Sequence, residues 1–246
     1  MEIITVAVQK GGTGKTTTVL TLAQAATSRG IKCLAVDLDP QGNLSLALKA
    51  DTRGEGSYAL LNGTSALDLI QHTDQGIDII PANRDLSTIT SGKGSARRLK
   101  KALEPIRRWY GLILIDTPPT AGELQYNALA AATGLIIPLQ ADIYDLQSLF
   151  QITDTAEQIQ KSNPDLRILG FILSRYDQRS TITKRMQEII TEKAEEQGVP
   201  FLGVVRNGVA IREAAAFQQS LYEYAPKSNP AQDFMAIFDR LTTGKL

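Results

Sequence analysis

The chain has 246 residues, in which 26 Lys and Arg residues balance 26 Asp and Glu residues. This balance excludes a protein that relies on its overall field to bind nucleic acid or membrane, so any such contact needs a local basic surface. Cys33 is the only cysteine, which excludes an internal disulfide and a multi-cysteine metal cage. The N-terminus shows no leader pattern, and we expect a cytoplasmic protein.

Apolar runs rich in β-branched residues alternate along the chain with segments of helical periodicity. Strands are predicted at 3–8, 31–37, 77–81, 112–115, 135–139, 168–173 and 199–205. Helices are predicted at 15–29, 95–110, 122–132, 145–161, 181–197 and 230–242. This alternation predicts a doubly wound α/β fold, with a mostly parallel sheet and helices on both faces. We expect a single domain over 1–246, with loops at 51–56 and 91–95.

A glycine-rich loop joins the first strand to the first helix. It reads Lys10-Gly11-Gly12-Thr13-Gly14-Lys15-Thr16-Thr17. The glycines allow tight turns that present backbone amides to phosphate, and the helix adds its positive N-terminal end. In such a loop the last lysine reaches the β- and γ-phosphates, and the next hydroxyl binds Mg²⁺. The loop departs from the usual pattern because Gln9 stands where glycine is expected, and Lys10 adds a second lysine.

Carboxylates follow two of the predicted strands. Asp37 and Asp39 follow the second strand, and Asp116 follows the wholly apolar run at 112–115. Ligands of parallel α/β sheets bind at the carboxyl ends of the strands. A buried carboxylate is costly without a cation, and Mg²⁺ is a suitable partner. Thr16, Asp39 and Asp116 are therefore the predicted metal ligands, while capping of the following turn is the structural alternative for each aspartate.

The motifs together resemble those of a known family. Residues 10–17 resemble the deviant Walker A loop of the ParA/MinD superfamily of dimerising P-loop ATPases. Residues 37–43 resemble the ParA switch I sequence, and 115–119 resemble its Walker B and switch II motif. The similarity continues through 80–83 and 206–214 towards 226–228, so it covers most of the chain. The Asp-Pro-Gln-Gly-Asn form of switch I favours the ParA branch.

The resemblance implies a slow, partner-stimulated ATPase that uses ATP and Mg²⁺. It makes Lys10, Lys15 and Asp39 catalytic: Lys10 crosses to the partner's nucleotide, and Asp39 orients the attacking water. It gives Asp37 a role in supporting the loop or the metal shell. The implied nucleotide contacts comprise residues 10–17 together with Arg206 and Asn207, with 174–175 as a further adenine candidate. The structural alternative for Lys10 is a solvated loop lysine.

The resemblance also implies an ATP-bound homodimer, non-specific DNA and a ParB-like adaptor as partners, with association to the nucleoid in the ATP state. Two segments are basic enough to contact DNA. Residues 93–108 hold seven basic side chains and one acid. The second segment comprises Arg175, Arg179, Lys184 and Arg185, extended by Arg212. The family's use of its C-terminal region favours the second segment, and a solvated helix face is the alternative for each.

Other functions fit parts of the same pattern. A MinD-like, membrane-cycling regulator is the main alternative, but the C-terminal helix at 230–242 mixes acids with bases and is expected to pack in the core. We expect no stable membrane association. A redox relative with an iron–sulfur cluster needs more cysteines than the chain has. An amidoligase remains open, without a motif for a second substrate. His72 is expected on the surface.

Overall fold

The computed structural model describes residues 2–90 and 95–243. The strands in this part of the chain are β1 (Glu2–Val6), β2 (Cys33–Asp37), β3 (Gln71–His72), β4 (Asp78–Ile80), β5 (Leu112–Asp116), β6 (Gly134–Leu139), β7 (Arg167–Tyr176) and β8 (Phe201–Arg206). These eight described strands form one sheet in the order β3-β4-β2-β5-β1-β6-β7-β8. Neighbours are parallel except for the antiparallel edge pair β3 and β4. The predicted mostly parallel α/β sheet is confirmed.

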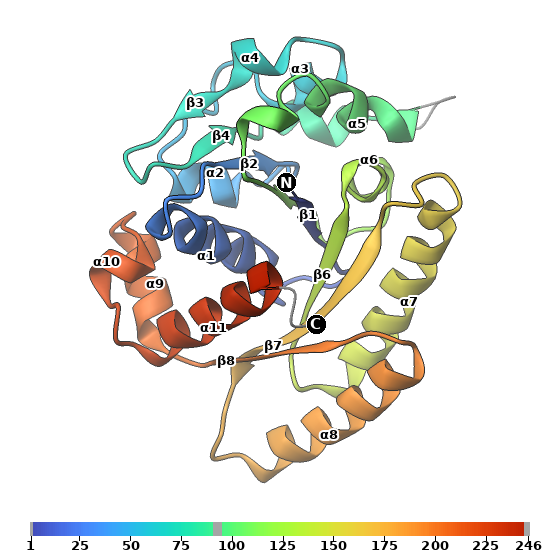
Figure 1. Cartoon of the computed structure of the whole chain (residues 1–246), viewed down its shortest axis with the longest axis vertical. Coiled ribbons are helices and arrows are strands. Elements are labelled where there is room, and N and C mark those ends of the chain that lie inside the picture. Colours follow the sequence, from blue (N-terminus) through green and yellow to red (C-terminus); the bar gives the residue numbers. More distant parts are fainter. Residues whose placement is uncertain (1, 91–94, 244–246) are drawn as a thin grey trace.

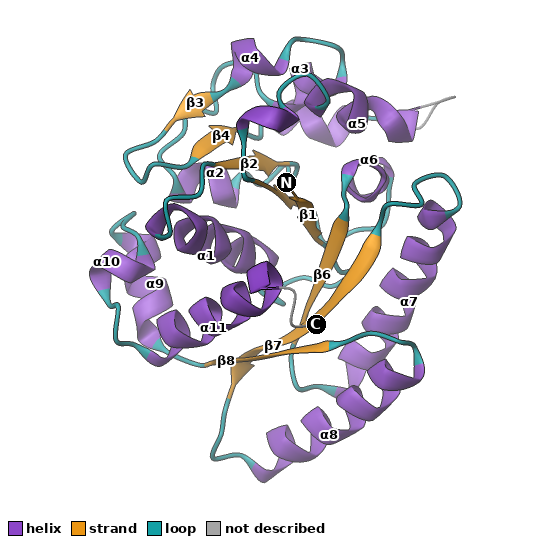
Figure 2. Ribbon diagram, viewed as in Figure 1, coloured by secondary structure: helices purple, strands orange, loops and turns teal. Residues whose placement is uncertain are grey.

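Helices cover both faces of the sheet. They are α1 (Lys15–Ser28), α2 (Asn43–Ala47), α3 (Ser57–Leu61), α4 (Ala66–Leu69), α5 (Arg98–Leu103), α6 (Glu123–Ala131), α7 (Ile143–Gln160), α8 (Thr181–Glu196), α9 (Val209–Ala216), α10 (Leu221–Tyr224) and α11 (Asn229–Thr243). In Figure 1, α1 and α9 to α11 lie on one side of the strands, and α6 to α8 lie on the other. Figure 2 shows the same layers by element type, with helices on both sides of the sheet.

Apolar residues bury the helices against the sheet. On one face, α1 and α11 share a core in which Leu22, Phe234 and Ile237 are buried with Ile4 and Val6 of β1. Two further clusters join α5 and α6, and α7 and α8, to the other strands. The expectation that the C-terminal helix packs in the core is confirmed. Within the described residues, no helix is long and apolar enough to cross a membrane.

The predicted helix at 95–110 is wrong in extent. The structure forms α5 over six residues and then a short 3₁₀ turn at Arg107–Trp109. Pro105 explains the break, because proline lacks an amide hydrogen and its ring clashes with the carbonyl four residues earlier in a continuous helix. Residues 91–94 of the expected loop, including Lys93, lie outside the described residues.

Several short elements escaped the sequence patterns. They are α2, α3, α4, α9, α10 and β3. Most span only one or two turns, too short for helical periodicity to be read from sequence, and they depend on tertiary contacts. The backbone amide and hydroxyl of Ser45 in α2, for example, both donate to Asp37 at the end of β2. His72 is exposed as expected, and it lies on β3 with Nδ1 against the Asp78 carboxylate.

Candidate nucleotide-binding site

Parallel pairing gathers the loop and the carboxylates at one edge of the sheet. Val6, the last residue of β1, pairs in register with Asp116 of β5. Asp116 in turn pairs with Asp37 of β2. The Thr117 hydroxyl donates to the Val6 carbonyl at 2.8 Å and fixes the two strand ends together. The glycine loop, which follows β1, therefore lies beside both aspartates.

The phosphate loop, residues 10–17, adopts the backbone that its glycines permit. Gly12 has φ 76° and Gly14 has φ 96°, the left-handed region that a side chain disfavours. Gly14 precedes α1, and no side chain of the described residues caps this helix. The first amides of a helix lack intrahelical partners, so this end can bind an anion. The loop is thus shaped for phosphate oxygens.

Side chains from two neighbouring strand ends hold the phosphate loop in place. The Ser174 hydroxyl on β7 donates to the Thr13 carbonyl at 2.7 Å. Gln140, which follows β6, donates from Nε2 to the Gly12 carbonyl at 2.8 Å. Sequence reasoning missed Gln140. Its place directly after a predicted strand was the available signal, because that strand end lies at the ligand edge.

Lys15 turns into the phosphate loop. Its Nζ donates to the Lys10 carbonyl at 2.8 Å, and the residue is buried. Burial lowers the pKa of Lys15, while the charges of Asp116 and Asp39 oppose this effect. A phosphate placed in the loop would stabilise the ammonium form by direct attraction. The arrangement suits a lysine that binds an anion rather than one that faces water.

Three carboxylates lie close together behind Thr16. The Thr16 hydroxyl donates to Asp116 Oδ2 at 2.7 Å. Burial raises the pKa of Asp116 well above its usual range, and the charge of Asp37 adds to the shift. Burial likewise raises the pKa of Asp37 to about 6, against hydrogen bonds from Ser45 and Asp39. Asp37 therefore supports the switch I loop, since it accepts from the Asp39 amide as well as from Ser45.

The residues fit a magnesium ion that shares its coordination with phosphate and water. Asp39 is buried beside Asp37 and accepts the Gln41 amide on Oδ1 at 3.0 Å. The described residues hold no group of three or more His, Cys, Asp or Glu side chains that could bind a metal alone. Hydroxyl and carboxylate oxygens are ligands that Mg²⁺ prefers, and it often keeps several waters and substrate oxygens. A cation here would also offset the energetic cost of burying the Asp116 carboxylate in its charged form.

The side chain of Lys10 contacts α7. Its Nζ lies 2.9 Å from Asp145 Oδ2 and 3.7 Å from Asp142 Oδ2. The Asp145 side chain is 0% exposed and that of Lys10 is 28% exposed. Burial raises the pKa of Asp145, while the hydrogen bond from Lys10 lowers it. The second lysine is therefore paired within its own chain here, rather than solvated.

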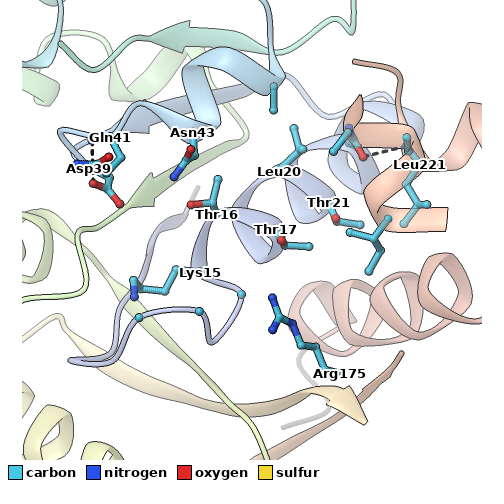
Figure 3. Close-up of a pocket in the computed structure, with 18 of the residues that line it drawn as sticks. Lys15, Thr16, Thr17, Leu20, Thr21, Asp39, Gln41, Asn43, Arg175 and Leu221 are labelled. Atoms are coloured by element: carbon cyan, nitrogen blue, oxygen red, sulfur yellow. Dashed lines mark hydrogen bonds between the residues drawn. The ribbon is translucent and has the colours of Figure 1, made fainter. Parts of the chain in front are cut away.

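Two adjoining clefts open at the phosphate loop. One, of about 470 Å³, is lined by the loop, Asp39, Leu20 and Ile211. The other, of about 370 Å³, is lined by Gly14, Arg175, Asn207 and further residues of β8 and α9. Figure 3 shows Lys15, Asp39 and Arg175 around the first cleft. Together the clefts offer room for a nucleotide whose phosphates lie on the loop.

The remaining predicted site residues are spread over this side of the sheet. The Arg206 guanidinium is held by Asp233, with nitrogen–oxygen distances from 2.6 to 3.1 Å. Asn207 is exposed and lines the second cleft, as does Arg212. Arg179 precedes α8, and Lys184 and Arg185 lie exposed on it, where Arg185 pairs with Glu188 at 2.8 Å. Among these residues, the second cleft brings together Arg175, Arg206, Asn207 and Arg212, whereas the α8 residues lie apart from it.

Known proteins are similar in sequence to this chain over most of its length. A family model described as an AAA domain matches residues 1–168. The chain is 35% identical to "Chromosome partitioning protein ParA" of Myxococcus xanthus, over 96% of this chain and 86% of that one. It is also 35% identical to "Chromosome-partitioning ATPase Soj" of Thermus thermophilus, over 97% and 94%.

The chain is also similar to solved structures over nearly its whole length. A protein of Mycobacterium smegmatis, described as cobyrinic acid a,c-diamide synthase with bound ATP analog and magnesium, superposes with a TM-score of 0.86 at 30% identity, over 98% of this chain and 94% of that one. The septum site-determining protein MinD of Pyrococcus horikoshii, complexed with Mg-ADP, superposes with a TM-score of 0.80 at 28% identity, over 99% and 97%. With its phosphate loop, its buried aspartates and these relatives, the chain belongs to the ParA/MinD family of P-loop ATPases.

Proposed function

We propose that this chain is a ParA-type partition ATPase that acts as one P-loop domain over 1–246. It binds ATP with Mg²⁺, dimerises, and then binds DNA without sequence preference. A ParB-like adaptor stimulates a slow hydrolysis that resets the cycle and so positions a plasmid, chromosome or other cargo. The observation that carries the proposal is the pair of lysines at the phosphate loop. Lys15 turns into the loop, while the partly exposed side chain of Lys10 contacts Asp145 of α7 instead of the loop.

The residues divide the chemistry between them. Lys15 and the loop amides hold the phosphates, and Thr16, Asp39 and Asp116 hold Mg²⁺. The ion, when bound, neutralises charge on the phosphate oxygens. Asp39 orients the attacking water. Lys10 of one copy stabilises the charge that develops at the other copy's nucleotide, as an arginine finger does in other P-loop enzymes.

The similarity to the family also supports the remaining nucleotide contacts and the partners. Beyond the phosphates, Arg206 and Asn207, which both line the second cleft, contact the nucleotide. The proposed DNA contacts are Arg175, Arg179, Lys184, Arg185 and Arg212. The protein works in the cytoplasm and associates with the nucleoid in its ATP state. Relatives of 35% identity that are named for chromosome partitioning support this proposal.

The structure favours this function over a MinD-like membrane cycle. Membrane targeting by an amphipathic helix needs an apolar face that is free to insert. In α11 the apolar side chains Phe234, Ile237 and Phe238 are buried in the core. Because these side chains pack in the core, the described part of α11 has no free apolar face that could insert into a membrane.

DNA binding by the purified protein in different nucleotide states tests the proposal. With ATP and Mg²⁺ we expect tight binding to duplex DNA of any sequence, and with ADP we expect little. Asp39→Ala should form ATP dimers that stay on DNA, because hydrolysis is blocked while nucleotide binding is kept. Equal DNA binding with ATP and ADP would contradict the proposal, and normal hydrolysis by Asp39→Ala would contradict the role of Asp39.

A further inference from the structure

A second basic surface lies far from the nucleotide clefts and from α8. We define the α5 surface by Arg97, Arg98, Lys100, Lys101, Arg107, Arg108 and Trp109. Glu104 is the single acid between residues 95 and 109. Leu99, Leu103 and Ile106 are buried and anchor this segment to the core. In Figure 1, α5 lies near the top and α8 near the bottom, so the two basic segments are separate surfaces.

Most cations of the α5 surface are not neutralised by neighbouring acids. Arg107 pairs with Glu104 at 3.1 Å, and Lys100 donates to the Asn163 amide oxygen at 2.9 Å. Within residues 2–90 and 95–243, no ion pair engages Arg97, Arg98, Lys101 or Arg108.

The basic residues of α8 differ in this respect. Arg185 pairs with Glu188 at 2.8 Å, and Lys193 pairs with Glu196 at 2.7 Å. Partners on the same helix reduce the charge that α8 presents to a polyanion. The α5 surface therefore presents the less compensated positive charge of the two.

A groove beside α5 adds neutral donors to these charges. The polar residues that line this hollow of about 590 Å³ are Arg98, Lys101, Asn62, Thr64 and Ser65, and apolar residues of the same segments line most of the rest. Arginine, lysine, hydroxyl and amide side chains are the groups that commonly contact nucleic-acid phosphates. Arginine is well suited, because its planar guanidinium binds phosphate through two hydrogen bonds.

Trp109 marks the end of the same surface. It follows Arg107 and Arg108 directly, and it is 44% exposed. An exposed tryptophan beside arginines can lie against the sugar–phosphate backbone of a duplex, where its indole N–H can donate to a phosphate oxygen. The apolar side of α5 is buried in the core, so the segment has no amphipathic face with which to insert into a bilayer. These features favour nucleic acid over a membrane.

We propose that the α5 surface binds the phosphate backbone of duplex DNA without reading its sequence. The proposal rests on the partition function proposed above and adds a contact surface outside the predicted Arg175–Arg185 segment. Each phosphate that the protein neutralises releases a counterion and steepens the salt dependence of binding by about 0.9 in log K against log salt. The number of contacts is therefore measurable.

The test uses the full chain with ATP and Mg²⁺ and a labelled duplex, titrated at several salt concentrations. Arg98→Glu/Lys101→Glu should weaken binding about tenfold or more and reduce the salt slope by about two. Glu104→Gln frees Arg107 and should tighten binding by about two- to fivefold, a gain that misfolding cannot produce. Arg84→Glu/Lys227→Glu applies the same charge change at exposed residues outside α5, α8 and both predicted surfaces, and serves as the control. ATP-dependent dimerisation verifies that each variant is folded.

The only tryptophan of the chain gives a direct readout at the surface. Trp109 emission should change when DNA binds. If wild type binds DNA, both α5 variants bind it with the same affinity and Trp109 emission does not change, the α5 surface does not contact DNA. The proposed partition function then stands. If wild type fails to bind DNA with ATP, the partition function fails and this inference fails with it. A Trp109 response to phosphatidylserine vesicles, and none to DNA, would replace the DNA proposal with a membrane contact.

Discussion

At the scale of single residues, the pairing of Lys10 opposes the proposed dimer. Lys10 must leave Asp145 before it can reach a partner's nucleotide. The Asp145 carboxylate would then stay buried with Oδ1 already lacking a hydrogen-bond partner among the described residues. Leaving a buried charge unpaired is costly. The contact between Lys10 and α7 therefore stabilises the monomer against the dimer.

Asp145→Asn should remove this restraint at nearly constant volume. Because the neutral amide attracts Lys10 less, we expect ATP-dependent dimerisation at about tenfold lower protein concentration, equivalent to ~1.4 kcal/mol. Sedimentation with a non-hydrolysable ATP analogue measures it. Asp142→Asn is the matched control, since Asp142 lies farther from Nζ and its side chain is 44% exposed. A weaker dimer in Asp145→Asn would show that the carboxylate assists Lys10 rather than holding it back.

At the scale of elements, α3 begins in tight contact with the end of β4. The Ser57 amide donates to the Pro81 carbonyl at 2.8 Å. A Cβ on Gly56 would lie 2.1 Å from that carbonyl oxygen, which only a backbone shift can relieve. The strand end and the helix start are therefore held together through a position that excludes any side chain.

Gly56→Ala should lower the free energy of unfolding by about 2 kcal/mol or more, because the clash separates α3 from the sheet. Chemical denaturation monitored by circular dichroism measures it. Gly54→Ala is the control two residues away, where a Cβ meets nothing within 4 Å, and it should stay within about 0.5 kcal/mol of wild type. Equal stability of the two variants would contradict the packing described for α3.

At the scale of the whole molecule, the buried carboxylates make stability depend on pH when no metal is bound. Burial raises the pKa of Asp37 from 3.8 to about 6 and raises that of Asp116 in the same direction. Between those values the folded chain keeps a proton that the unfolded chain has released, so the free energy of unfolding falls as pH rises. For Asp37 alone the effect is at most about 3 kcal/mol.

The nucleotide-free protein in a chelator should therefore be more stable near pH 5 than near pH 7 by about 1–3 kcal/mol. Urea unfolding at the two pH values measures the difference. Adding ATP and Mg²⁺ should raise stability more at pH 7, because the ligand binds the ionised carboxylates. A stability that rises from pH 5 to pH 7 in the chelator would contradict the burial described for these groups.

The sequence by itself determined the family, the sheet and the residues of the phosphate loop. These follow from local signals: glycines that permit left-handed turns, apolar runs that can only be buried strands, and aspartates at strand ends. It could not determine the short helices around the site, because such elements depend on contacts with distant parts of the chain. The break in the helix at 95–110 did have a local signal, Pro105, which the spacing of the apolar residues concealed.

Only the tertiary structure decided which acidic group each basic side chain contacts. It paired Lys10 with Asp145, Arg206 with Asp233 and Arg185 with Glu188. It left most of the α5 surface without acidic partners and placed Gln140 on the phosphate loop. Long polar side chains have no periodicity that fixes their partners. Their pairing is set by which helix and strand ends the sheet order brings together, and this order appears only when the whole chain is folded.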